Sequence, residues 1–225
     1  MQLHADLTEP AVVDGGTLAW VRSPIPGVER RMLERDGDEV ARATSLVRYA
    51  PGSAFSAHEH GAGEEFLVLD GVFSDETGDF PAGSYVRNPP GSRHAPASAP
   101  GTVIFVKLRQ MPAEETQPLR LSTRDPALWT GDGPGVERAL LFDAPWERVV
   151  MLRLSRGHRD LRESWRGGVE WFVVEGAIEV DGVEHGPGAW LRFPPGATVA
   201  IRAPEHALVY RKSGHLARGT RSAGP

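Results

Sequence analysis

The feature that most limits how this chain can fold is a repeat of its turn residues. Framework residues of the first half recur 105 positions later without a gap, and the pairs are Gly52 and Gly157, Gly71 and Gly176, Gly83 and Gly188, Pro89 and Pro194, Pro90 and Pro195, and Gly91 and Gly196. The segment PGVER occurs at 26–30 and again at 134–138, offset by 108 positions. Because glycine and proline mark turns, their coincidence predicts two homologous domains.

Short apolar runs between these turns predict the type of domain. The runs are rich in β-branched residues and of strand length: ATSLVRYA, EEFLVLDG, TVIFVKL, RVVMLRL and EWFVVEGAIEV. Many short strands separated by turns are typical of sandwiches and barrels. We therefore expect an all-β protein of two tandem barrels, with domains at 1–112 and 119–225. The stretch MPAEETQP between them, with two prolines and two acids, is the expected linker.

Four residues of the first half have the chemistry of metal ligands. His58 and His60 are two apart, so on a strand both imidazoles lie on one face. Glycines at 61 and 63 permit a tight turn, after which Glu64 opens the next strand, and His94 follows a second turn at Pro89–Gly91. Three imidazoles and one carboxylate suit a divalent transition metal.

These residues and their framing turns resemble the two signature motifs of the cupin superfamily. The first motif places Gly, His-x-His, Glu and Gly where this chain has Gly52, His58, His60, Glu64 and Gly71. The second places Gly, Pro-x-Gly, His and Asn where the chain has Gly83, Pro89, Gly91 and His94, and departs from it at the last position, which is Ser98. The resemblance implies two jelly-roll barrels and a metal held by the same four ligands.

Residues 20–110 resemble, more narrowly, the ChrR-like cupins, named after the metal-binding domain of an anti-sigma factor. The chain has no cysteine and no His/Cys zinc domain of the anti-sigma type, so we reject an anti-sigma function. Glu65 is the one rival to Glu64 as the acidic ligand. Both faces of the strand are apolar, so alternation does not decide between them, but the six-residue spacing to Gly71 favours Glu64.

The second copy keeps the turns but not the ligands. The positions of His58, His60, Glu64 and His94 are occupied in it by Glu163, Trp165, Val169 and Val199. Its own histidines, His158, His185 and His206, fall at none of the ligand positions. We expect a degenerate barrel filled by side chains such as Trp165, Val169, Phe172 and Val199, and hence one metal per chain.

Composition and charge limit the classes of partner that the sequence favours. Net charge is −5 and the charges are interspersed, so no basic stripe points to nucleic acid or to a membrane surface. The N-terminal sequence MQLHADLTEP carries no apolar run of a signal peptide, and we expect a cytoplasmic protein. The expected partner is a small-molecule substrate or ligand, and the sequence allows a homodimer.

The sequence is compatible with three functions. The first is a mononuclear dioxygenase acting on a small oxygenated molecule, since an octahedral ion with four protein ligands keeps two open positions. The second is a metal-binding sensor or ligand-binding module, and the third a metal-dependent isomerase or lyase. Iron(II) is the favoured metal, with zinc, manganese and nickel as alternatives. The candidate pocket residues are Phe66, Tyr85, Arg87 and Phe105, with Lys107 beside them, although Arg87 and Lys107 have counterparts in Arg192 and Lys212 that indicate a role in the fold.

Overall fold

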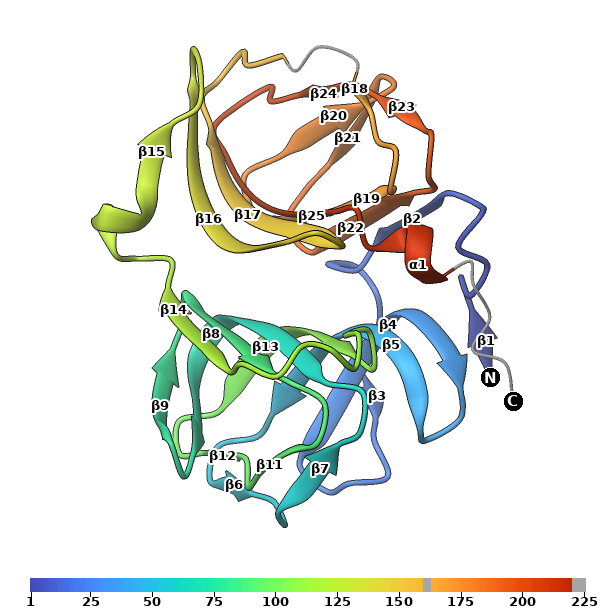
Figure 1. Ribbon diagram of the computed structural model, residues 1–225. Helices are drawn as coiled ribbons and strands as arrows, with labels where there is room; N and C mark the ends of the chain where they lie inside the picture. The colour runs from blue at the N-terminus through green and yellow to red at the C-terminus, as the bar shows by residue number, and fades with distance from the viewer. Residues whose placement is uncertain (160–162, 220–225) are drawn as a thin grey trace. The chain divides into compact units, whose positions relative to one another are not determined.

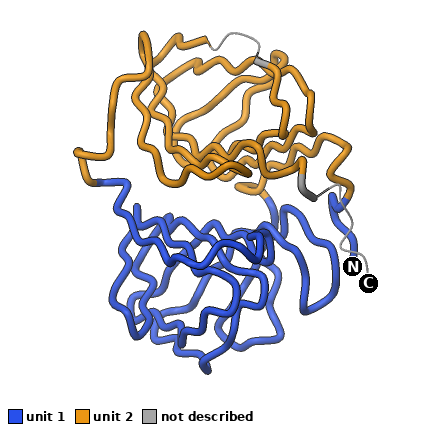
Figure 2. Tube along the Cα trace, in the orientation of Figure 1, with its two compact units in different colours: residues 1–5, 18–124 blue, residues 6–17, 125–225 orange. Residues whose placement is uncertain are grey.

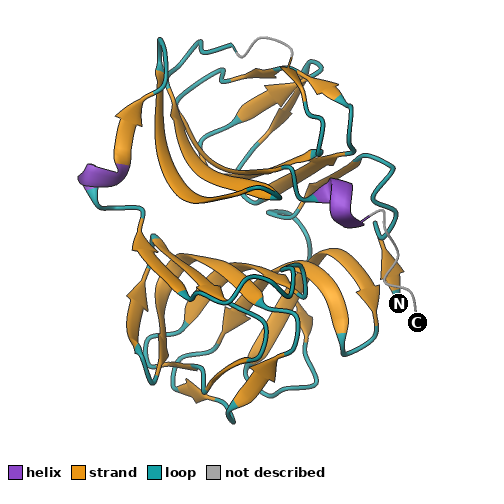
Figure 3. Ribbon diagram, in the orientation of Figure 1, coloured by secondary structure: helices purple, strands orange, loops and turns teal. Residues whose placement is uncertain are grey.

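The computed structural model describes residues 1–159 and 163–219, which form two compact units built almost entirely of antiparallel strands (Figures 1 to 3). The first unit comprises residues 1–5 and 18–124, and the second comprises residues 6–17 and 125–225. Within the described residues no helix is long and apolar enough to cross a bilayer.

The strands of the first unit form a large curved sheet and a smaller layer of short strands that closes it. In the large sheet the neighbours run in the order β1, β4, β5, β13, β8, β10 and β14. The strands of this unit are β1 (Gln2–Leu3), β3 (Val21–Arg22), β4 (Val28–Gly37), β5 (Ala41–Tyr49), β6 (Ser53–Ala54), β7 (His58–His60), β8 (Glu64–Asp75), β9 (Gly78–Pro81), β10 (Ser84–Asn88), β11 (Ser92–His94), β12 (Ala97–Ser98), β13 (Thr102–Leu108) and β14 (Leu119–Ser122).

The second unit repeats this plan. Its large sheet has the order β15, β16, β17, β25, β19, β22 and β2, and short strands again close it. Its elements are β2 (Ala11–Asp14), the 3-10 helix η1 (Pro126–Leu128), β15 (Trp129–Gly131), β16 (Val136–Ala144), β17 (Glu147–Leu154), β18 (Glu163–Ser164), β19 (Val169–Glu175), β20 (Ile178–Val180), β21 (Val183–His185), β22 (Ala189–Phe193), β23 (Thr198–Val199), β24 (Ile201–Arg202), β25 (Ala207–Ser213) and the short helix α1 (Leu216–Gly219). The expected all-β fold of two jelly-roll barrels is confirmed.

Strand register reproduces the repeat read from the sequence. Lys107 pairs with Glu65 in the first unit as Lys212 pairs with Glu170 in the second, and both sheets carry a bulge at the equivalent point of that pairing. Gly71 and Gly176 show why glycine recurs: each has a positive φ, and a Cβ would lie only 2.0 Å and 1.8 Å from the carbonyl oxygens of Gly101 and His206. The repeated glycines therefore mark backbone positions that no larger residue can occupy.

The units differ from the expected domains of 1–112 and 119–225 in two segments. Strand β2 belongs to the second unit because it pairs with β22, and β14 belongs to the first because it pairs with β10. Residues 113–124 therefore remain with the first barrel, where Glu115 is buried in an ion pair with Arg87. The edge strand β14 of the first barrel therefore lies just before the second barrel's long strand β16 in the sequence. The edge strand β2 of the second barrel lies before the first barrel's long strand β4.

Each unit has its own apolar core. In the first barrel, side chains from β5, β8, β10 and β13 point into one cluster with Phe66, Val68, Val86 and Ile104. The second barrel buries a larger cluster that includes Trp171, Leu191 and Val209. The core of the first barrel holds the strands that carry the candidate site.

Candidate metal centre

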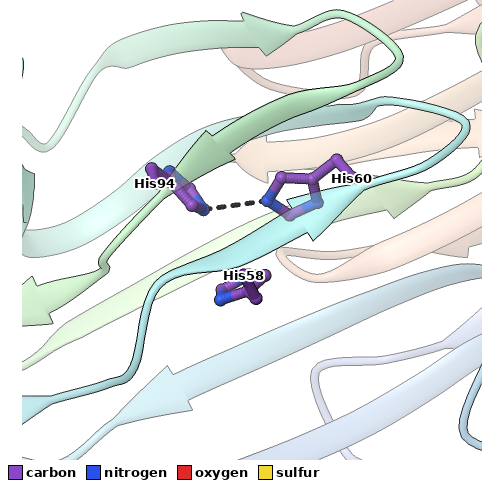
Figure 4. A group of neighbouring side chains, drawn as sticks. All are labelled: His58, His60 and His94. Carbon is purple, nitrogen blue, oxygen red and sulfur yellow. Dashed lines mark hydrogen bonds between the residues drawn. The ribbon is translucent and has the colours of Figure 1, made fainter.

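Two adjacent short strands bring three histidines together in the first barrel (Figure 4). His58 and His60 lie on β7, and His94 lies on β11, directly across from His58 in the antiparallel pairing. One ring nitrogen from each of the three lies within 4.8 Å of the others. The Nε2 atoms of His60 and His94 are 2.9 Å apart. These three residues could hold a metal ion, and the described part of the chain contains no other such group of three ligating side chains.

Glu64 lies beside two of the three imidazoles. Its Oε2 is 3.5 Å from Nε2 of His60 and 3.6 Å from Nε2 of His94. Cross-strand register places Glu64, Phe66 and Val68 on the face that points into the barrel, opposite Asn88, Val86 and Ile104. Glu65 lies on the other face, where its carboxylate accepts a hydrogen bond from Nη1 of Arg87 at 2.7 Å. Of the two adjacent glutamates, only Glu64 faces the histidines.

Acceptors on the far side of two imidazoles orient their rings. Nδ1 of His94 lies 3.2 Å from Oδ2 of Asp75, and Nδ1 of His58 lies 3.2 Å from the carbonyl oxygen of Ser56. An acceptor at Nδ1 favours the tautomer that leaves Nε2 free to bind a metal. This supporting arrangement is characteristic of metal-ligating histidines.

Burial favours the neutral, metal-binding form of His60 and His94. Burial, followed by the charge of His58, lowers the pKa of His60 to about 4, and burial lowers the pKa of His94 as well. Burial raises the pKa of Glu64, while the neighbouring histidines and the amide of Asn88 act in the opposite direction. Two buried imidazoles with lowered pKa values beside a buried carboxyl fit a divalent transition metal.

An apolar floor and an open side complete the surroundings. Fully buried Phe73 lies 5.7 Å from the ring of His94 and 4.5 Å from Phe66, between ring centroids. Tyr49 packs against Phe73 and Phe55, at 6.0 and 4.9 Å. His58, by contrast, is exposed, so the cluster can be reached from solvent on that side.

Three of the four expected pocket residues lie on the other face of the sheet. Phe66 faces the cluster, but Tyr85, Arg87 and Phe105 share the face of Glu65 and Leu67 and point away from it. Arg87 is fully buried and binds both oxygens of Glu115, at 2.8 and 2.7 Å, as well as Glu65. Lys107, on the same face, donates to Thr44. These residues support the sheet, as the counterparts Arg192 and Lys212 indicated.

The structure adds residues that sequence reasoning missed. Asn88 donates to Glu64, Asp75 holds His94, and Arg120 donates to Asn88. Burial, followed by the charge of Glu64, raises the pKa of Tyr49, whose phenol therefore stays protonated. Alternation on β10 could have found Asn88, which lies two residues after the core residue Val86, whereas Asp75 and Arg120 reach the site only through strand pairing.

Ser98, where the second motif has asparagine, supports the backbone. Its side chain is buried, and its hydroxyl donates a hydrogen bond of 2.6 Å to the carbonyl of Val72. The departure from the motif therefore leaves the four candidate ligands in place.

Comparison with known proteins agrees with this geometry. The family model described as the ChrR cupin-like domain matches residues 8–112. No curated protein matches the chain significantly. Residues 8–112 are thus similar to that cupin domain, and the fold of the chain supports the same superfamily assignment.

Solved structures share the fold at low sequence identity. A candidate dioxygenase from Nostoc punctiforme superposes with a TM-score of 0.74 and 16% identity, covering 93% of this chain and 84% of that one. The pirin YhhW from Escherichia coli, solved with nickel(II), has a TM-score of 0.68 and 15% identity, covering 91% and 98%. Salicylate 1,2-dioxygenase from Pseudoaminobacter salicylatoxidans has a TM-score of 0.60 and 14% identity, covering 79% and 71%.

Proposed function

We propose that the first barrel holds one divalent transition metal through His58, His60, His94 and Glu64, and that the protein is a mononuclear dioxygenase acting on a small oxygenated organic molecule. The observation that carries the proposal is the convergence of three imidazole nitrogens within 4.8 Å beside a buried carboxylate. Iron(II) is the metal we propose, with zinc, manganese and nickel as alternatives. Bound there, the ion would polarise oxygen atoms of the substrate and activate dioxygen.

The chain's own residues define what can approach that position. Exposed His58 marks the side from which a molecule enters, and the buried rings of Phe66 and Phe73 exclude water from the opposite side. The protonated hydroxyl of Tyr49 can donate a hydrogen bond to an oxygen of the substrate. An apolar floor with few polar donors suits a compact organic molecule.

Two of the solved structures with this fold lend support through their names. One is described as a candidate dioxygenase and another is salicylate 1,2-dioxygenase, while the pirin YhhW carries nickel. At 14 to 16% identity these likenesses bear on the fold alone, so the reaction rests on the donor set.

Oxygen consumption tests the proposal. Protein loaded anaerobically with Fe²⁺ is expected to consume dioxygen when given a substrate with vicinal or β-related oxygens, from a panel of diketones and hydroxyketones. The uptake should require both iron and substrate, and His206→Ala, at an exposed histidine of the second barrel, should leave it unchanged. Tight binding of a panel compound without oxygen uptake would instead support a sensor or ligand-binding module.

A further inference from the structure

A chain of hydrogen bonds connects the candidate ligand Glu64 to an arginine on another strand. The amide Nδ2 of Asn88 donates to Oε2 of Glu64 at 2.9 Å, and Nη2 of Arg120 donates to Oδ1 of the same amide at 2.6 Å. Oε2 is the Glu64 oxygen that lies 3.5 and 3.6 Å from the two buried imidazoles. The series of hydrogen bonds therefore ends on Oε2 of Glu64, the atom best placed to bind a metal.

Arg120 determines which way the amide of Asn88 points. An asparagine side chain has an oxygen that accepts and a nitrogen that donates, and either could face Glu64. Because guanidinium nitrogens only donate, Arg120 holds Oδ1 and turns Nδ2 toward the carboxylate. Nη1 of Arg120 is itself fixed by the carbonyl oxygens of Arg87 and Leu119, at 2.8 and 2.9 Å. The three groups thus form a fixed support for one carboxylate oxygen.

The arginine comes from outside the matched cupin segment. Arg120 lies on β14, which pairs with β10 so that Arg120 is opposite Val86 and points to the same side as the core. The family model ends at residue 112, eight residues before Arg120. The support for Glu64 is therefore supplied by the segment that follows the first repeat.

The second barrel provides an internal comparison for this chain of contacts. Strand β2 pairs with β22 in the same register as β14 with β10, which makes Val12 the counterpart of Arg120 and Phe193 the counterpart of Asn88. The counterpart of Glu64 is Val169, and those of His60 and His94 are Trp165 and Val199. The barrel without histidine ligands has thus replaced Asn88 and Arg120 by apolar residues as well, whereas it keeps Arg192 and Lys212 on the other face.

We propose that Arg120 is a positioning residue for the metal centre, acting through the amide of Asn88 to hold Oε2 of Glu64 in the orientation that binds the ion. The inference rests on the metal site of the proposed function. A positioning role for Arg120 makes strand β14 part of the metal centre. The matched segment 8–112 by itself would therefore hold metal more weakly than the whole chain.

The test is titration of the full chain with Co²⁺, whose visible spectrum reports how many ligands it has. Arg120→Met is expected to bind Co²⁺ about tenfold more weakly, the loss usual for supporting residues. A field effect alone predicts the opposite sign, because removing a positive charge should strengthen cation binding. Arg93→Met, at an exposed arginine next to His94, serves as the matched control and should bind at least as tightly as wild type. Equal or tighter binding by Arg120→Met would overturn the inference.

A double-mutant cycle separates positioning from general destabilisation. In the Glu64→Ala background, Arg120→Met should cause no further loss of Co²⁺ affinity, because the support no longer has a carboxylate to hold. Asn88→Leu should lose as much affinity as Arg120→Met, and the two together should lose no more than either alone. Additive losses would contradict the proposal that Arg120 acts through Asn88. A wild-type chain that binds no Co²⁺ would instead contradict the proposed function on which this inference rests.

Discussion

His94→Ala is expected to lower the affinity for a divalent transition metal by more than about 100-fold, beyond the range seen when only a supporting residue is lost. His94 places Nε2 2.9 Å from that of His60 and 3.6 Å from Glu64, so its loss removes a donor from the middle of the group. Turnover should disappear with the metal. Equilibrium titration with Ni²⁺, monitored by calorimetry, measures the loss of metal affinity.

The fold should survive this substitution. His94 lies at the end of the three-residue strand β11, and its replacement by alanine removes no glycine or proline of a turn. Val199→Ala, at the equivalent position of the second barrel, is the matched control and should leave metal affinity at the wild-type value. Unchanged Ni²⁺ affinity in a folded His94→Ala protein would place the metal elsewhere.

Trp171→Ala is expected to destabilise the second barrel by roughly 3 to 5 kcal/mol, the usual loss for a buried aromatic residue. Trp171 is 1% exposed and packs edge-on against Trp165 and Phe193, with centroids 5.7 and 5.9 Å away. Urea unfolding of the metal-free protein measures the change. The folded fraction should keep wild-type metal affinity, since the second barrel has Trp165, Val169 and Val199 where His60, Glu64 and His94 stand in the first.

Trp129→Ala is the control for Trp171→Ala. Trp129 is only half-buried on β15 and stacks with Arg153 at 3.7 Å, so its loss should cost about 1 kcal/mol or less. A loss of metal affinity in folded Trp171→Ala would mean that the second barrel takes part in the metal site. A stability loss no greater than that of Trp129→Ala would mean that the core of this barrel does not depend on Trp171.

The repeat and the site's histidines could be predicted from sequence for a physical reason. Tight turns such as that at Gly71 admit only glycine, so their spacing records the fold directly. His58 and His60 share a face by strand alternation alone. Both signals are local, and they survive without knowledge of how strands pair.

The pocket and the domain limits could not be predicted in this way. Both faces of β8 and β10 are buried, so hydrophobicity did not indicate that Phe66 points inward while Tyr85 and Arg87 point outward. Only the register with β13 separates the two faces. Arg120 reaches the site from a strand that follows the first repeat, and β2 pairs within the second barrel, and neither pairing leaves a mark in the local sequence.

The central claim is one metal centre per chain, located in the first barrel. Its most direct test is elemental analysis of the whole chain, loaded anaerobically with Fe²⁺ and freed of loosely bound ions, alongside the His58→Ala/His60→Ala double variant. We predict one iron per wild-type chain and none in the variant. Two tightly held ions per chain, or one ion retained by the variant, would contradict the account.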